Sequence, residues 1–153
     1  MKLFKRTRTK KLHSFFWFGV SSVAGILCLM YMMPLEIALV SIAVLFLHEF
    51  GHFAMAKLKG AEADWPLFIP LLFFVVGMTH ITHLHKKDIS AVALSGPIIG
   101  MIVSLVAFAI GILLGSSLVV LAAAWSFVFE LFAATAGKDG SYAREWRSYM
   151  TTS

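Results

Sequence analysis

Cysteine and charged residues are both scarce in this sequence. Cys28 is the single cysteine among 153 residues, which excludes an internal disulfide framework and a cysteine-rich metal cluster. Charged residues make up 14% of the chain and apolar residues 59%, whereas soluble domains average about 25% charged and about 45–50% apolar. The composition therefore argues against a water-soluble fold and predicts one membrane-embedded domain, since no internal repeat or low-complexity linker divides the chain.

The first long apolar run predicts a membrane span. Residues 14–33 are 20 positions without a charge, the length needed to cross a hydrocarbon core of about 30 Å. A cleavable signal peptide is the rival interpretation, because basic residues precede the run. A retained span is favoured, because the run is longer than a signal-peptide core and offers no small-x-small cleavage site.

Three further spans follow from the remaining apolar runs. Residues 37–56 are apolar except for two histidines and a glutamate. The uncharged stretch 89–129 is 41 residues long, twice the spanning length, and Gly115-Ser116-Ser117 near its middle predicts a turn between spans at about 89–114 and 118–136. Residues 65–79 are apolar over only 15 positions and contain two prolines, which favours a re-entrant or β-like membrane hairpin.

The 13 basic residues are placed asymmetrically along the chain. Six precede the first predicted span, four lie between the second and third, and three follow the fourth. With four spans all of them fall on one side, so the positive-inside rule predicts cytoplasmic N- and C-termini and a cytoplasmic central loop. The basic residues are thus topology signals that contact anionic lipid, and nothing in the sequence indicates nucleic acid.

Three ionisable side chains interrupt the second predicted span as His48-Glu49-Phe50-Gly51-His52. Positions i and i+4 share a helix face, so both imidazoles can bind one cation, while Glu49 can reach a metal-bound water without being a ligand. This is the zinc metallohydrolase pattern, in which Zn²⁺ lowers the pKa of water to about 7 and the glutamate takes the proton. Two surface histidines beside a glutamate are the alternative, which fails because an apolar span offers no water to solvate them.

A catalytic zinc site needs a third protein ligand and an open position. Lys57 follows His48 by nine residues, which places His48 about 14 Å below the cytoplasmic boundary at about 1.5 Å per helical residue. Asp139 lies just beyond the fourth span on the same side, and Gly137 and Gly140 would let the chain bend its carboxylate toward the histidines. Asp139 is therefore the candidate third ligand.

Taken together, the motifs of residues 35 to about 140 resemble the site-2 protease family of intramembrane zinc metalloproteases. The motifs are His-Glu-Phe-Gly-His in a span, Phe68-Ile69-Pro70 opening an apolar hairpin, Ala-Leu-Ser-Gly-Pro-Ile-Ile-Gly at 93–100, and Asp139-Gly140 after the last span. The resemblance implies an all-α integral membrane fold of about four transmembrane helices plus the hairpin. It also implies one Zn²⁺ per chain, held by His48, His52 and Asp139, with Glu49 as general base.

The implied substrate is a transmembrane segment of another protein or a membrane-retained remnant. Because a helical substrate hides its carbonyls, it must unwind locally, and we hypothesise that the hairpin of residues 65–79 supplies an edge on which an extended segment pairs. Phe68, Ile69 and Pro70 of this hairpin are candidate substrate-binding residues. The sequence leaves open the substrate, the cleavage position and the oligomeric state.

One motif departs from the family. The family usually carries Asn-x-x-Pro upstream of Asp-Gly, but this chain has neither residue there, and Glu130 stands nine positions before Asp139 where eight would be expected. Three roles for Glu130 stay open: it binds substrate, acts as an additional acid, or hydrogen-bonds a neighbouring helix.

Two other patterns lie outside these motifs. His80, His83 and His85 predict a solvated interfacial cluster rather than a second metal site, because Lys86 and Lys87 follow directly. Small residues recur every three or four positions and predict a close-packing face that lets the third span approach the histidine-bearing helix. They are Gly96, Gly100, Ser104, Ala107, Gly111 and Gly115.

The predicted organisation has three parts, a basic cytoplasmic segment 1–13, a membrane-embedded metalloprotease domain 14–140 and a cytoplasmic interfacial tail 141–153. The predicted location is the cell membrane of a prokaryote, as a multi-pass protein. Two alternative functions remain. The missing Asn-x-x-Pro fits a catalytically silent homologue that binds membrane segments, and intramembrane histidines and acids also line the paths of metal transporters.

Overall fold

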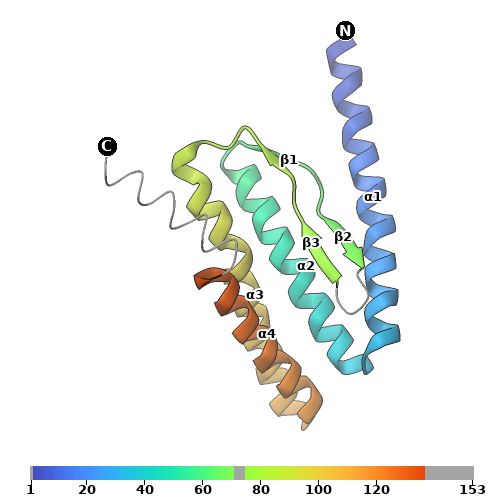
Figure 1. Cartoon of the computed structure of the whole chain (residues 1–153), viewed down its shortest axis with the longest axis vertical. Coiled ribbons are helices and arrows are strands. Elements are labelled where there is room, and N and C mark those ends of the chain that lie inside the picture. Colours follow the sequence, from blue (N-terminus) through green and yellow to red (C-terminus); the bar gives the residue numbers. More distant parts are fainter. Residues whose placement is uncertain (1, 71–74, 137–153) are drawn as a thin grey trace.

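Four long helices dominate the structure, a computed structural model that describes residues 2–70 and 75–136, with side chains from His13 onward (Figure 1). All four contain a stretch long and apolar enough to cross a membrane, so the four predicted spans are confirmed as helices and are compatible with a multi-pass membrane protein. The helices are α1 (Lys2–Met32), α2 (Leu35–Leu58), α3 (Ile89–Leu114) and α4 (Ser117–Thr135). The predicted tail 141–153 lies outside the described residues.

The helices are joined as two antiparallel pairs by short turns at one end of the molecule, with the α2–α3 connection at the other end (Figure 1). Gly115 ends α3 with a φ of 65°, a left-handed conformation that glycine adopts without strain. The Ser116 hydroxyl then accepts a hydrogen bond from the Val119 N–H at 3.4 Å and caps α4. The turn predicted at Gly115-Ser116-Ser117 is therefore confirmed.

The connection between α2 and α3 forms two small antiparallel sheets. In the outer sheet β1 (Glu62–Ala63) pairs with β4 (Ile81–Thr82), and in the inner sheet β2 (Leu67–Pro70) pairs with β3 (Val75–Met78). A 3-10 turn, η1 (Lys86–Asp88), leads into α3.

The prediction of a membrane hairpin at residues 65–79 is wrong in this respect, because these small sheets do not form one. A strand of four residues reaches about 13 Å, less than half of the roughly 30 Å of a hydrocarbon core.

Helix α1 covers the outer edge of β2. The Ser14 hydroxyl accepts a hydrogen bond from the Trp65 N–H at 3.1 Å, and the Ser21 hydroxyl accepts one from the Phe68 N–H at 3.2 Å. Seven helical residues advance about 10.5 Å, which matches the roughly 10 Å between amides three residues apart on a strand. The other strand of the hairpin, β3, lies next to α2 (Figure 1).

Helices α2, α3 and α4 pack closely on one another. A Cβ on Gly51 of α2 would lie 2.8 Å from the Ser95 carbonyl oxygen of α3, so only a glycine permits this approach. Further along, Val40 and Val44 of α2 pack with Ala122 and Ala123 of α4. Of the small-residue face predicted on α3, Gly96 therefore lies against the histidine-bearing helix, whereas Gly100 and Gly111 lie against α4.

Candidate functional site

Helix α2 presents His48 and His52 side by side. The residues are one helical turn apart, and their Nε2 atoms lie 3.1 Å from each other with the ring centroids 4.9 Å apart. His52 is 8% exposed, so the pair lies in the protein interior beside the equally buried Glu49. The i, i+4 geometry predicted from the sequence is therefore present.

The second nitrogen of each imidazole also has a partner. His52 Nδ1 lies 2.8 Å from the Val92 carbonyl oxygen of α3, and His48 Nδ1 lies 2.6 Å from Oε2 of Glu130 on α4. Carbonyl and carboxylate oxygens accept hydrogen bonds, so Nδ1 donates in both rings. If both rings are neutral, each Nε2 then carries a lone pair, and a cation or a shared proton between the two nitrogens would stabilise them at this distance.

Glu49, next to the histidine pair on α2, is held by the β-hairpin. Its Oε2 accepts a hydrogen bond from the Thr79 hydroxyl at 2.7 Å, and the same hydroxyl lies 3.3 Å from the Glu49 carbonyl oxygen. Thr79 directly follows β3, so the hairpin fixes the carboxylate beside the histidine pair. One carboxylate oxygen remains for other contacts.

Three of these polar side chains, Glu49, His52 and Glu130, each lie against a glycine. A Cβ on Gly77 of β3 would overlap the Glu49 side chain, and one on Gly96 of α3 would overlap the His52 imidazole. A Cβ on Gly100 of α3 would overlap the Glu130 carboxylate. Glycines of β3 and α3, which have no side chain, therefore leave the space that these polar groups occupy.

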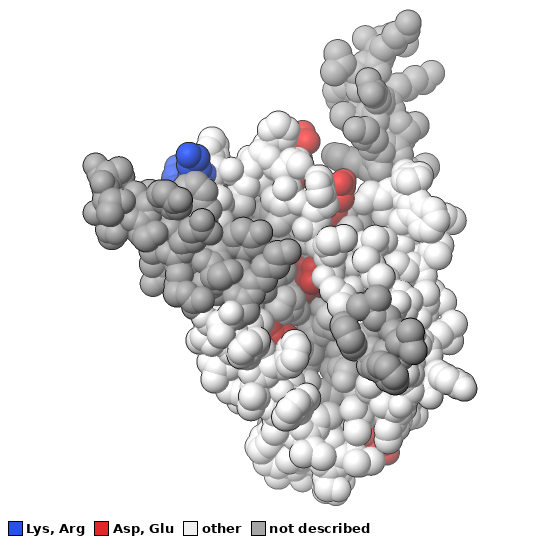
Figure 2. Space-filling model, viewed as in Figure 1, with Lys and Arg blue, Asp and Glu red and all other residues white. Residues whose placement is uncertain are grey.

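The polar side chains of the site line a large cleft between the helices and the hairpin, with a volume of about 1730 Å³. Most of its wall is apolar, and acidic side chains lie along the hollow on this face of the molecule (Figure 2). No Lys or Arg occurs among the described residues that line it. The ionisable lining residues are His48, Glu49, His52, Asp64, His80 and Glu130. Such a lining favours a cation.

The other predicted site residues are placed as follows. Asp139 lies outside the described residues, and among those described no group of three His, Cys, Asp or Glu side chains is arranged to hold a metal ion. Phe68 is 1% exposed and stacks on Phe46 with ring centroids 4.2 Å apart, whereas Ile69 lines the cleft and Pro70 is exposed. Phe68 thus packs the hairpin onto α2, and its role in substrate binding stays a prediction.

His80 of the connecting loop lines the same cleft as His48 and His52, but its contact is with Asp64. His80 Nδ1 lies 3.5 Å from Asp64 Oδ2, and both side chains are more than half exposed. Solvent therefore reaches His80 and Asp64, in line with the predicted solvation of this cluster.

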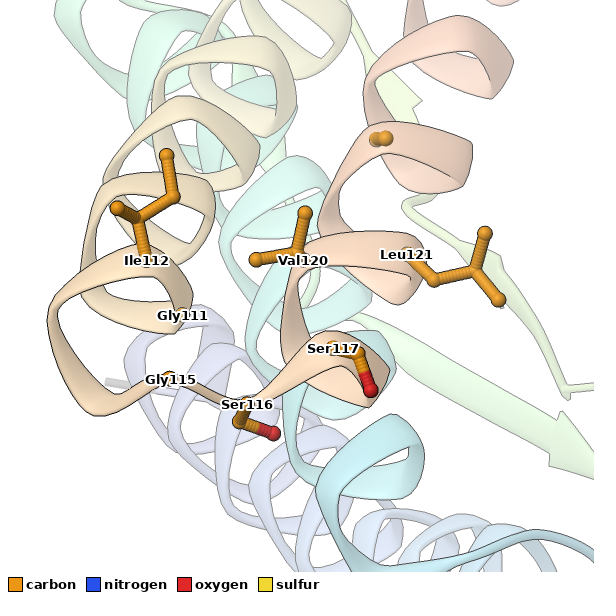
Figure 3. A pocket seen from close by; sticks show the side chains of 8 residues that line it. Gly111, Ile112, Gly115, Ser116, Ser117, Val120 and Leu121 are labelled. Atoms are coloured by element: carbon orange, nitrogen blue, oxygen red, sulfur yellow. The ribbon is translucent and has the colours of Figure 1, made fainter.

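A second hollow lies at the far end of the helices, where α3 turns into α4 (Figure 3). Its volume is about 600 Å³, and small residues such as Gly111, Gly115 and Ser116 line it. Val92 and Gly111 are 19 residues apart on one helix, about 28 Å at 1.5 Å per residue. Among the residues that the structure describes, no ionisable side chain lines it, and it is distinct from the histidine site.

Sequence reasoning missed three contributors to the site, namely the Thr79 hydroxyl, the Val92 carbonyl and Gly77. A backbone carbonyl carries no sequence signal, because every residue has one. Thr79 and Gly77 stand in a hairpin whose strand register decides which groups reach α2. Glu130 could be identified as a candidate from the sequence, because it is a charged residue in an apolar helix, but its contact with His48 could not be predicted.

Comparisons with known proteins found no match for this chain among protein-family models, curated proteins or solved structures. The functional argument therefore depends on the site itself.

Proposed function

We propose that this chain is an intramembrane zinc endopeptidase that cuts membrane-embedded segments of other proteins. The observation that carries the proposal is the convergence of the His48 and His52 Nε2 atoms, 3.1 Å apart, with each Nδ1 bonded to an acceptor. Buried Glu49 lies beside them. The resemblance to site-2 proteases noted in the sequence supports the same function.

The two imidazoles suit zinc in distance and orientation. Two nitrogen ligands at about 2.0–2.1 Å from a tetrahedral Zn²⁺ are separated by about 3.3 Å, close to the 3.1 Å between these atoms. An Nδ1–H donated to a carbonyl or a carboxylate is the usual support of a zinc-bound histidine, because it leaves Nε2 unprotonated. Asp139 is the proposed third ligand.

Glu49 is the proposed general base. When bound, zinc supplies Lewis acidity that lowers the pKa of water to about 7 and polarises a peptide carbonyl. Glu49 takes the proton of the attacking water and returns it to the leaving amine. The Thr79 hydroxyl donates a hydrogen bond to Glu49 Oε2 at 2.7 Å and so fixes the orientation of the carboxylate. Oε1 is then the oxygen that accepts the proton.

The substrate class follows from the wall of the cleft. Trp125 and Phe129 of α4 and Val76 and Met78 of β3 line it, so an apolar segment would be stabilised there by burial. An extended segment would pair along β3. Because the Phe68 N–H points outward to Ser21, the pair Phe68–Gly77 is the non-hydrogen-bonded type, and Gly77 also directs its backbone groups outward, toward the cleft.

Substrate N-methylation tests the pairing with β3. Peptides that carry an N-methyl group at successive single positions should be cleaved poorly at every second position, since alternate amides face β3. The measurement is the cleavage rate of each peptide relative to the unmethylated one. If the cleavage rates did not alternate with the position of the N-methyl group, the substrate would not pair with β3 as a strand.

Zinc content and peptide cleavage test the function as a whole. Purified protein in liposomes should hold about one zinc per chain, should cleave a transmembrane peptide, and should lose and regain cleavage with chelation and zinc readdition. Protein that holds zinc but cuts no candidate would favour a silent homologue. Zinc flux across the liposome without proteolysis would favour a transporter.

A further inference from the structure

Glu130 is a buried carboxylate in the C-terminal half of an apolar helix. It lies in α4 between Phe129 and Leu131 and is 6% exposed. A carboxylate there is costly unless it is paired and hydrogen-bonded. Its partner is His48 Nδ1 at 2.6 Å, a contact between helices that joins positions 82 residues apart. This length is typical of a charge-assisted hydrogen bond.

Three helices define the position of this carboxylate. Gly100 of α3 lies flush against it, since a Cβ there would overlap the carboxyl group. One turn further along α3, the Ser104 hydroxyl donates to the Gly100 carbonyl oxygen at 2.9 Å, so it does not compete for Glu130. The carboxylate is thus confined between α3 and the His48 ring, with little freedom to turn elsewhere.

The two imidazoles are supported unequally. A neutral carbonyl, that of Val92, holds His52, while a carboxylate holds His48. A carboxylate fixes the ring as the carbonyl does, but it also makes the imidazole a stronger donor of its Nε2 lone pair. It adds a negative charge next to a cation in an apolar environment, where charge balance has its largest effect.

We propose that Glu130 is a positioning residue for the metal site: it fixes the His48 ring through Nδ1 and supplies countercharge to the cation held at Nε2. This inference rests on the proposed zinc function and assigns to Glu130 a role other than contact with substrate. It also gives a reason for an acid near the place where the site-2 protease motif carries asparagine, because an amide could accept the hydrogen bond but could not balance charge.

Zinc affinity of the Glu130→Gln variant tests this inference. Glutamine keeps the size of the side chain and an oxygen that accepts from Nδ1, but it removes the charge. We expect zinc binding, measured by competition with a chelator, to weaken about 10–100-fold, and the absorption bands of the Co²⁺-substituted protein to shift. Glu62→Gln, an exposed residue of β1, is the matched control and should bind zinc as the wild type does.

A second variant reaches the same carboxylate from another helix. In Gly100→Ala the new methyl group displaces Glu130 from His48, so zinc affinity should also fall. In the double variant Gly100→Ala/Glu130→Gln the two losses should be less than additive, because both act on one contact. Circular dichroism of each variant separates loss of helix from loss of zinc.

Two outcomes would contradict this inference, and they can be distinguished from each other. If Glu130→Gln binds zinc as tightly as the wild type with an unchanged Co²⁺ spectrum, the carboxylate serves only as a hydrogen bond between helices and the positioning role is overturned. If the wild-type protein itself binds no zinc, the proposed function fails, and this inference fails with it.

Discussion

The Glu49→Gln variant should lose peptide cleavage while it keeps its zinc. Removal of a general base costs about 10²–10⁴-fold in rate, and the glutamine cannot take the proton from water. Its side-chain oxygen can still accept the hydrogen bond that Thr79 donates at 2.7 Å to the native carboxylate, so the fold around the site is preserved. The measurements are the cleavage rate of a transmembrane peptide and the zinc content by mass spectrometry.

Glu36→Gln is the matched control for this experiment. Glu36 is exposed in the first turn of the same helix, 13 residues from Glu49, or about 20 Å at 1.5 Å per residue. The control should cleave and bind zinc as the wild type does. Cleavage by Glu49→Gln at the wild-type rate would show that another group accepts the proton and would remove Glu49 from its proposed role.

Gly96→Ala should abolish or strongly weaken zinc binding although it changes none of the three proposed ligands. The new methyl group would overlap the His52 imidazole, which forces the ring to turn and breaks the 2.8 Å contact between Nδ1 and the Val92 carbonyl. Loss of such support costs about 10–100-fold in metal affinity, and displacement of Nε2 itself adds to this. The measurements are zinc affinity by chelator competition and peptide cleavage.

The loss of zinc binding in Gly96→Ala should come from overlap with the His52 ring and not from a lower stability of helix α3. Alanine favours a helix interior over glycine by about 0.8–1.0 kcal/mol, so the substitution does not weaken α3 itself. Gly19→Ala in α1 makes the same change where a Cβ would meet nothing within 4 Å, and it should leave zinc binding unchanged. If Gly96→Ala binds zinc as the wild type does, the His52 ring does not need its present orientation.

The helices and the histidine pair could be predicted from the sequence because their signals are local. The charge-free run 89–129 is twice a spanning length with small polar residues in its middle, and it becomes α3, the turn at Gly115 and α4. The i, i+4 placement of His48 and His52 on one face follows from helix geometry alone. These features need no knowledge of how the helices pack.

The supports of the pair could not be predicted, because they depend on packing between distant segments. Glu130 was a candidate for three roles, and only the approach of α4 to α2 shows which side chain it contacts. Similarly, the short run and two prolines of residues 65–79 predicted a membrane hairpin, and nothing local indicated that Ser14 and Ser21 would instead bond to a short hairpin. Backbone partners such as the Val92 carbonyl leave no mark in a sequence.

X-ray absorption at the zinc edge of the purified wild-type protein tests the central claim most directly. The account predicts one zinc per chain with two imidazole nitrogens at about 2.0–2.1 Å and oxygen ligands at about 2.0–2.2 Å. The His48→Ala variant should lose one imidazole contribution or the metal altogether. Wild-type protein that carries no zinc, or zinc whose ligands include no histidine, would contradict the account.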